Sequence, residues 1–474
     1  MRIRSLRLLS LTLACAALPL SMAGCSKRSS SNNNQSVVAP TTSSTGGATT
    51  STTTGATTST TTAPTTSTVA AGTLGGTPVV VGGNTSSGSA TSGATAAGFG
   101  KGTGRFVDGT ANLPTSASND YGADSGDLDG DGDIDIAIAV MDGPSRILWN
   151  DGKGKFSLRT TSFPALTMKA TDVRLIDADK DGDFDLIFSC NFEPARLFLN
   201  DGAGNFTLAA SLDPQNDAYV YKLAIGDADG DGWSDVFFAR AGQSTTSKGQ
   251  NKLFLSDKVR GFVEAPAGTI PVKFDDSLDA TFLDVNGDGH KDIFVANFGT
   301  RPTLLVNDGT GKFLNQTDVY VPATLSTYAT SVAQGDLDKD GDVDLFLGNE
   351  GAPGSTTPPP GEVNSWLNNQ GPNKTLLNAV SSAPTDAEAT WKLRLIDVNA
   401  DGWLDVVASQ LRSVQRLYLN QNGVLVDATA FLPAVNQTPS NSYGVVIGDF
   451  NGDQAPDLFF VRRNAQPWLF LNTP

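Results

Sequence analysis

The sequence is poor in histidine and cysteine, with one histidine and three cysteines in 474 residues. Cys15 and Cys25 lie in the first 25 residues, so only Cys190 remains in the rest of the chain and no intramolecular disulfide can form there. Cys190 follows a short apolar run, which predicts a small buried side chain. The single His290 lies inside an acidic repeat, so no Ser–His or Cys–His pair and no His-Glu-x-x-His zinc motif is expected.

Basic residues are also scarce. Lys and Arg number 33 against 50 Asp and Glu, and the formal net charge is −17. No basic patch offsets this acidity, which excludes nucleic acid as a partner. No glycine-rich motif of the Rossmann or P-loop kind is present. A carboxylate pair of the glycosidase kind is defined by its separation in space, so the sequence leaves that enzyme class open.

The acidic residues concentrate in a nine-residue stretch, Asp-x-Asp-x-Asp-Gly-x-x-Asp, which first occurs at residues 127–135. It recurs six times with Asp or Asn at position 3, and half of the 50 acidic residues stand at positions 1, 3, 5 and 9. Calcium takes six to eight oxygen ligands, which these side chains and a main-chain carbonyl at position 7 would supply. Glycine at position 6 permits a positive φ. One acidic turn could exist without metal, but seven in register predict about seven Ca²⁺ sites.

The predicted ligands stand at positions 1, 3, 5, 7 and 9 of each loop. In chain order they are Asp127, Asp129, Asp131, Asp133 and Asp135; Asp177, Asp179, Asp181, Asp183 and Asp185; Asp227, Asp229, Asp231, Trp233 and Asp235; Asp284, Asn286, Asp288, His290 and Asp292; Asp336, Asp338, Asp340, Asp342 and Asp344; Asp397, Asn399, Asp401, Trp403 and Asp405; and Asp449, Asn451, Asp453, Ala455 and Asp457. The position-7 side chains share nothing, as expected of a residue that binds through its main chain. The seventh loop departs from the pattern because Gln454 replaces glycine at position 6.

The residues after each loop exclude an EF-hand. Position 12 is apolar, as in Ile138 and Phe188, where an EF-hand has a bidentate glutamate. The apolar runs that follow position 9 are short, β-branched and aromatic, which predicts strands. A dockerin-type loop is disfavoured too, since it also needs a following helix.

The loops begin 50 to 61 residues apart with only strand signals between them, which predicts one four-stranded propeller blade per repeat. We therefore expect an all-β, seven-bladed β-propeller. The seventh repeat ends with residues 468–474 and has no fourth strand of its own. Residues 103–107 match the fourth strands of other repeats, so this N-terminal segment is expected to complete blade seven and close the ring.

These repeats resemble the FG-GAP/VCBS repeat proteins, whose propellers are similar to the head of integrin α chains. The resemblance covers about residues 98–474. It implies calcium loops on one face of the ring and partner binding on the other. We expect a non-catalytic, adhesion-like, monomeric binding module for a protein or polysaccharide at the cell surface or envelope. A polysaccharide lyase or hydrolase and a structural envelope or assembly factor remain alternatives.

Aromatic residues stand six positions before the first aspartate in four repeats: Tyr121, Tyr221, Trp391 and Tyr443. At the start of the innermost strand they would form a platform for a sugar or peptide, or pack between blades. Acidic residues of the same rim would be ligands, acid–base groups or a solvated edge: Asp120, Asp217, Asp275, Asp276, Asp279, Asp386 and Glu388. Insertions at residues 241–250 and 349–363 are either binding segments or tolerated loop growth.

The first 24 residues resemble a bacterial lipoprotein signal, with three arginines and an apolar run over residues 8–20. Residues 22–25 resemble a lipobox, which implies a lipidated Cys25, and Ser26 implies sorting to the outer membrane with a periplasmic or surface-facing domain. An ordinary secretory signal or an uncleaved anchor is the alternative. Residues 25–96 are rich in Ser, Thr and Gly and are expected to be a disordered tether before a domain at 97–474.

Overall fold

Strands make up nearly all the regular structure of the chain. The computed structural model describes residues 99–474 except 160–162, 213–217, 243–248, 326, 353–360 and 373. It contains 3-10 turns η1 (Thr110–Asn112), η2 (Thr429–Phe431) and η3 (Ala434–Gln437) and one short helix, α1 (Thr317–Tyr320). No helix among the described residues is long and apolar enough to cross a membrane. The expected signal, lipidated Cys25 and tether lie outside these residues.

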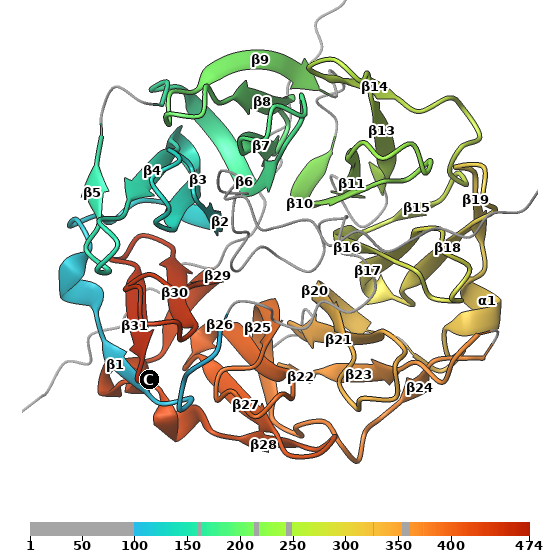
Figure 1. Cartoon of the computed structure of the whole chain (residues 1–474). Helices are drawn as coiled ribbons and strands as arrows, with labels where there is room; N and C mark the ends of the chain where they lie inside the picture. Colours follow the sequence, from blue (N-terminus) through green and yellow to red (C-terminus); the bar gives the residue numbers. More distant parts are fainter. Residues whose placement is uncertain are drawn as a thin grey trace, which may run out of the picture. The chain divides into compact units, whose positions relative to one another are not determined.

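Most strands pair into antiparallel units of four, which are arranged around a common centre in a propeller-like manner (Figure 1). We number the units along the chain. They are β2 (Asp120–Gly126), β3 (Asp135–Pro144), β4 (Arg146–Trp149) and β5 (Ser157–Leu158); β6 (Thr167–Ile176), β7 (Asp185–Cys190), β8 (Ala195–Leu199) and β9 (Thr207–Leu212); β10 (Tyr219–Gly226), β11 (Asp235–Ala241), β13 (Lys252–Ser256) and β14 (Phe262–Glu264); β16 (Ser277–Leu283), β17 (Asp292–Thr300), β18 (Thr303–Asn307) and β19 (Phe313–Asn315); β20 (Thr327–Gly335), β21 (Asp344–Asn349), β23 (Ser365–Asn368) and β24 (Leu377–Asn378); β25 (Ala387–Ile396), β26 (Asp405–Ser413), β27 (Arg416–Asn420) and β28 (Leu425–Asp427); and β29 (Ser440–Gly448), β30 (Asp457–Arg462), β31 (Trp468–Asn472) and β1 (Phe106–Asp108).

The apolar core lies between neighbouring units. One buried cluster combines Leu197 of the second unit with Val236 and Phe238 of the third. Strand β11 is buried along its whole length. A strand covered on both faces needs apolar side chains at successive positions, which explains the continuous apolar runs after each loop.

The last unit takes its fourth strand from the N-terminal part of the domain. Strand β1 is antiparallel to β31, with Phe106 opposite Asn472 and Asp108 opposite Phe470. Phe106 is buried in the cluster that contains Trp468. Main-chain bonds continue beyond β1, since the Gly109 N–H donates to the Leu469 carbonyl at 2.8 Å. Two strands more than 350 residues apart in the sequence therefore share one sheet.

Contacts between successive units, which we call seams, also use backbone pairing. Second strands run on to pair with the next first strand in β3–β6, β17–β20 and β26–β29. Short strands connect units three and four through β12 (Gly249–Gln250) with β15 (Phe274–Asp275), and units five and six through β22 (Glu362–Val363) with β25. A bridge between Asn119 and Arg463 joins units seven and one. In the described part of the chain, only the seam between units two and three has no such pairing.

An asparagine at the end of the third strand adds a second link at most seams. The Asn420 amide donates to the Leu337 carbonyl of the preceding unit at 2.8 Å and to the Leu404 carbonyl of its own unit at 3.1 Å. Equivalent bonds to the preceding unit are made by Asn150, Asn200, Asn307, Asn369 and Asn472. We call these five residues and Asn420, six in all, the seam asparagines. In unit three the position is Ser256, and no such bond is present among the described residues.

Replacing a seam asparagine should destabilise the domain. Asn420 is fully buried, so Asn420→Ala would leave two carbonyls without a donor and cost about 1–3 kcal/mol in the free energy of unfolding. Denaturant titration with calcium present measures this change. Asn378→Ala, at an exposed position of β24, is the matched control and should change stability by less than about 0.5 kcal/mol. Equal stability of both variants would show that the bridging amide has no net effect.

Candidate functional site

Each acidic loop joins the first strand of a unit to the second and turns in the same way. The Asp127 carboxylate accepts the N–H of Gly130 at 2.7 Å and of Gly132 at 3.0 Å. Position 6 has a positive φ in every loop, as predicted, including Gln454 at 70°. Position 4 is also left-handed, which was not predicted because Lys180 and Ala400 occupy it with φ of 58° and 57°.

The aspartate at position 9 is the buried end of each loop. In the first loop, Asp135 accepts the N–H of Leu128 at 3.2 Å and of Asn150 at 2.8 Å. The same two bonds recur at Asp185, Asp235, Asp292, Asp344, Asp405 and Asp457. Position 9 therefore ties the loop to the third strand, a structural role beyond the ligand role that the sequence predicted.

Carboxylates converge in the loops that have aspartate at position 3. Ligand oxygens lie within 4.8 Å of one another in four groups: Asp127, Asp129 and Asp135; Asp177, Asp179 and Asp185; Asp227, Asp229 and Asp231; and Asp336, Asp338 and Asp340. Buried oxygens of Asp129, Asp177, Asp179 and Asp336 have no hydrogen-bond partner. An unpartnered buried carboxylate oxygen is costly, and a hard cation would satisfy it. These residues fit a calcium ion.

Loops with asparagine at position 3 are arranged differently. The side-chain amide donates to the position-5 carboxylate in Asn286–Asp288 at 2.9 Å, Asn399–Asp401 at 2.9 Å and Asn451–Asp453 at 3.0 Å. One carboxylate oxygen at position 5 is thus already partnered. To coordinate a cation, the asparagine would have to rotate so that its side-chain oxygen replaces the nitrogen. These three loops are therefore less preorganised for cation binding than the loops with aspartate at position 3.

Basic side chains approach the first three loops. Asp129 pairs with Arg159, Asp179 lies 3.3 Å from Arg260, and Asp231 lies 2.7 Å from Lys258. A cation would compete with these partners for the carboxylates. Asp133 and Asp183 at position 7 have raised pKa values because of partial burial and neighbouring aspartates.

The tryptophan side chains at position 7 make contacts that the sequence did not predict. The Lys180 ammonium lies 4.4 Å from the ring centre of Trp233, and Lys339 lies 4.2 Å from that of Trp403. In both pairs, position 4 of one loop contacts position 7 of the next. A loop with lysine at position 4 is thus followed, in both cases, by a loop with tryptophan at position 7.

The metal-free protein should lose stability as the pH rises. Burial raises the pKa of Asp135 and Asp457 to about 8, although main-chain N–H bonds act in the opposite direction. The pKa of the other position-9 carboxylates rises to about 7: Asp185, Asp235, Asp292, Asp344 and Asp405. The unfolded chain ionises these groups near pH 4, whereas the folded chain keeps their protons longer, so folding becomes less favourable as the pH rises from about 4 to 8.

Melting curves from pH 5 to pH 8 in a chelator should therefore show a falling melting temperature. Saturating calcium should reduce this fall, because the metal binds the ionised carboxylates. Identical pH profiles with and without calcium would contradict the assignment of these residues to a metal site.

The seventh loop should bind calcium most weakly. A non-glycine residue in the left-handed region costs about 1–2 kcal/mol, and Gln454 has this conformation. We expect Gln454→Gly to raise calcium affinity at this loop by up to about tenfold. Titration calorimetry would resolve the weakest site, and Lys180→Gly at another left-handed position controls for a general effect of glycine. No gain in affinity would show that the conformation of Gln454 does not limit binding.

The predicted aromatic residues come together at the opposite ends of the first strands. The collar comprises Tyr121, Tyr443, Trp391 and Tyr221, whose successive ring centres are 4.7, 5.0 and 5.8 Å apart. Every first strand has a β-bulge at this position, which sets the side chain at the mouth of the central channel. Trp391 is 9% exposed and the others are half-buried, so the collar packs between units and still presents aromatic surface.

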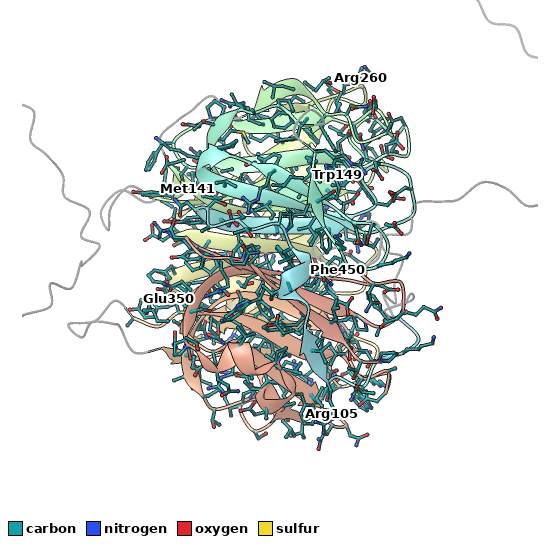
Figure 2. All side chains as sticks on the ribbon, turned by 90° about the vertical axis from the view of Figure 1, so that its left-hand side faces the viewer. Arg105, Met141, Trp149, Arg260, Glu350 and Phe450 are labelled. Carbon is teal, nitrogen blue, oxygen red and sulfur yellow. The ribbon has the colours of Figure 1, made fainter. Side chains whose placement is uncertain are left out.

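The collar and the loops occupy opposite faces. Met141 and Glu350, which lie at the collar ends of second strands, project to one side of the domain, and Arg260, beside the second loop, projects to the other (Figure 2). Beyond Tyr221 the aromatic row continues through Tyr219 to Phe192, with ring centres 5.7 and 4.3 Å apart.

Acidic residues expected at a solvated rim are mostly engaged in pairs. Buried Asp120 lies 2.6 Å from Arg146, and Glu388 pairs with Arg416. Asp279 is buried in the channel, Asp275 lies 2.8 Å from Lys273, Asp276 accepts the Gly242 N–H, and Asp386 accepts from Tyr418. A solvated edge is therefore wrong for Asp120 and Asp279. Asp217 and the middle of both insertions lie outside the described residues.

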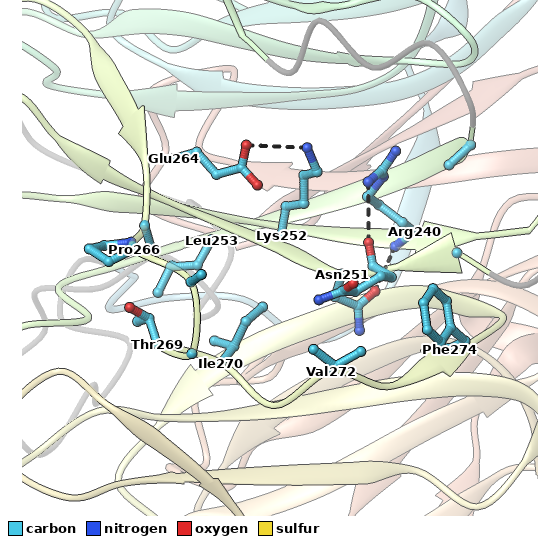
Figure 3. Close-up of a pocket in the computed structure, with 16 residues that line it drawn as sticks. Arg240, Asn251, Lys252, Leu253, Glu264, Pro266, Thr269, Ile270, Val272 and Phe274 are labelled. Atoms are coloured by element: carbon cyan, nitrogen blue, oxygen red, sulfur yellow. Dashed lines mark hydrogen bonds and ion pairs between the residues drawn. The ribbon is translucent and has the colours of Figure 1, made fainter. Parts of the chain in front are cut away.

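A separate pocket lies beside units three and four (Figure 3). Its volume is about 500 Å³, and its lining combines Arg240, Lys252 and Glu264 with the apolar side chains of Val272 and Phe274. The Lys252 ammonium lies 3.3 Å from Glu264. The sequence does not indicate this pocket, because its walls come from β11, β12, β13, β14 and β15 and from the segments that connect them.

Comparisons with known proteins agree with the repeat structure. The model of the FG-GAP-like repeat matches residues 127–188, 185–238, 227–295, 284–347 and 397–460. Each match begins within one acidic loop and ends in the strand that follows the next acidic loop. No curated protein matches the chain.

Several solved structures are similar to this chain at low sequence identity. The N-terminal domain of BBS1, crystallised in complex with ARL6, has a TM-score of 0.50 at 10% identity and covers 78% of this chain and 98% of its own. Sqt1 of Saccharomyces cerevisiae has a TM-score of 0.45 at 10% identity, covering 79% of this chain and 100% of its own. YCF48 bound to a D1 peptide has a TM-score of 0.45 at 12% identity, covering 78% and 95%. With its repeats matched over more than half its length, the chain belongs to the family of FG-GAP-like repeat proteins.

Proposed function

We propose that this chain is a calcium-stabilised protein-interaction module whose partner docks on the collar face. The ring would be a seven-bladed propeller, closed by β1, with up to seven cations bound on the opposite face. The loops would keep the first and second strands in place, and the collar would supply the contact surface. Aromatic side chains suit this role because they bury a large area at a low cost in conformational entropy.

The observation that carries this proposal is the strained end of the aromatic row. Phe192 has φ of 54°, a conformation that bulky residues rarely adopt. The Phe192 N–H donates to the Ala218 carbonyl at 3.3 Å, and the Phe192 ring packs against Tyr219. Strain of this kind persists where the surrounding structure over-determines it and is concentrated at binding sites.

Binding to an array of proteins and polysaccharides, with calcium and with chelator, tests this function. The double variant Tyr121→Ala/Tyr443→Ala should lose at least about tenfold in affinity for any partner found. Phe274→Ala removes an exposed aromatic in the pocket of Figure 3 and is the matched control. Unchanged affinity of the collar variant would show that the collar is not the docking site. Reduced affinity of Phe274→Ala would instead place the docking site at the pocket.

A polysaccharide-acting enzyme is the second candidate, because the collar face also carries ion-paired carboxylates. Any polysaccharide bound on the array should be tested for release of reducing or unsaturated ends. If the unmodified protein releases such ends and Glu388→Gln does not, the protein is an enzyme and the proposed binding function is wrong. Binding without turnover supports the interaction module.

We also propose that the domain is attached to the outer membrane through lipidated Cys25 and the following tether. The lipobox-like residues 22–25 support this assignment. Labelling with radioactive palmitate in a Gram-negative host should mark the full chain and not Cys25→Ser. An unlabelled full chain would contradict the anchor without affecting the proposed binding face.

A further inference from the structure

Charged side chains line the central channel next to the collar. They are Asp124, Asp172, Arg174, Lys222, Asp279, Lys392 and Arg394, and all are at most 4% exposed. All come from first strands, three or five positions before the first aspartate of a loop. Four are cationic and three anionic, so the group has one positive charge in excess.

Within this group two lysines share one carboxylate, and among the described residues neither Arg394 nor Asp124 has an ion-pair partner. One Asp124 oxygen accepts the Leu175 N–H at 3.1 Å, and the other has no hydrogen-bond partner. Arg174 lies 2.8 Å from Asp172. Lys392 and Lys222 share Asp279, at 3.2 and 3.7 Å. Among the described residues no carboxylate lies within ion-pair distance of Arg394, whose side chain donates only to the neighbouring Leu393 carbonyl at 3.1 Å. Its Nε has no partner at all.

A small cavity lies beside this unpaired guanidinium. Its volume is about 10 Å³, and its lining includes Arg394, Lys392, Lys222 and Asp172, with Tyr121 and Tyr443 toward the collar. Three of these four charged residues are cationic, and Asp172 is already paired with Arg174. A volume of this size holds about one water-sized sphere. A carboxylate or phosphate group would not fit.

We propose that this cavity binds a single monatomic anion of halide size, which under physiological conditions is chloride. The anion pairs with Arg394 and completes the charge balance of the channel. Burial of an unpaired charge is strongly unfavourable, whereas a bound counter-ion removes the excess and gives the orphaned donors an acceptor. The site lies behind the collar and is independent of the acidic loops.

Loss of a proton from Lys392 is the competing way to remove the excess charge. Burial lowers the pKa of Lys392 well below its ordinary value, against the opposing effect of Asp279. Burial also lowers the pKa of Arg394, to about 10, so the guanidinium stays charged at neutral pH. With Lys392 neutral, the group would have no excess positive charge, and the cavity would hold a water molecule in place of an anion.

Crystals of the calcium-loaded protein grown in sodium bromide distinguish these two accounts. An anomalous peak beside Arg394 and Lys392 supports the anion site, and its absence at full bromide concentration overturns it. In solution, the melting temperature should be about 1–3 °C higher in sodium chloride than in sodium gluconate at equal concentration.

A charge-removing variant tests which residue holds the anion. Arg394→Met should abolish the difference between chloride and gluconate, whereas Lys153→Met, at an exposed position, should retain it. An unchanged difference in Arg394→Met would place the chloride effect elsewhere and overturn the proposal. If Arg394→Met does not fold, the bromide experiment on the unmodified protein decides alone.

Discussion

Removal of calcium should lower the melting temperature of the full chain by about 10 °C or more. A ligand that binds only the folded state stabilises it by about 2.7 kcal/mol per site at one hundred times its dissociation constant, and at least four loops place carboxylates together. Without metal, these carboxylates also repel one another. Calorimetric melts in a chelator and in the same chelator saturated with calcium measure the effect.

Magnesium serves as the control for charge screening, since it demands a smaller octahedral site and should restore less stability than calcium. Equal melting temperatures with and without chelator would show that the acidic loops do not hold structural metal. Such a result would leave the collar and its proposed partner untouched.

Deletion of the N-terminal strand should be nearly as damaging. A chain that starts at Asn112 lacks β1, so β31 presents an open edge and the cluster around Trp468 loses Phe106. We expect a large loss of stability, or aggregation, although every acidic loop remains. A chain that starts at Thr95 retains β1 and should melt like the full chain.

Folding kinetics give this experiment a second measurement. Pairing of β1 with β31 joins residues more than 350 apart, so it should form late in refolding. The shorter chain should then lack the slowest refolding phase. Melting at the same temperature by both chains would show that β1 does not contribute to closing the ring.

Much of the fold could be predicted because each repeat carries its own local signals. Aspartate and glycine at fixed loop positions determine the turn, and apolar runs on either side determine the strands. The left-handed conformation of Gln454 was predictable for this reason, from its alignment with glycine in six other copies. Lys180 and Ala400 were missed because their side chains give no sign of a left-handed backbone.

Features that depend on neighbours around the centre were harder to predict. The seam asparagines recur at the end of the third strand, but only the arrangement of units shows that the Asn420 amide reaches Leu337. The channel charges likewise stand at fixed offsets, yet nothing local shows that Lys222 and Lys392 share Asp279. The collar could be predicted because aromatic residues repeat at one offset from the loops. The channel positions hold acidic residues in some repeats and basic residues in others, so they form no recognisable repeat.

The seam between units two and three has a mechanical consequence. Among the described residues it has neither strand pairing nor a seam asparagine, because Ser256 stands at that position. Across it, the Asn191 side chain accepts the Val220 N–H at 2.9 Å, and the Phe192 N–H donates to the Ala218 carbonyl at 3.3 Å. Its links include the contact of Lys180 with Trp233 and the ion pair of Arg260 with Asp179, both at acidic loops. If the ring is closed as proposed, tension should separate it first at the seam that has no strand pairing. We therefore expect force from a docked partner to open the domain here, and calcium bound in the adjoining loops to raise the force required.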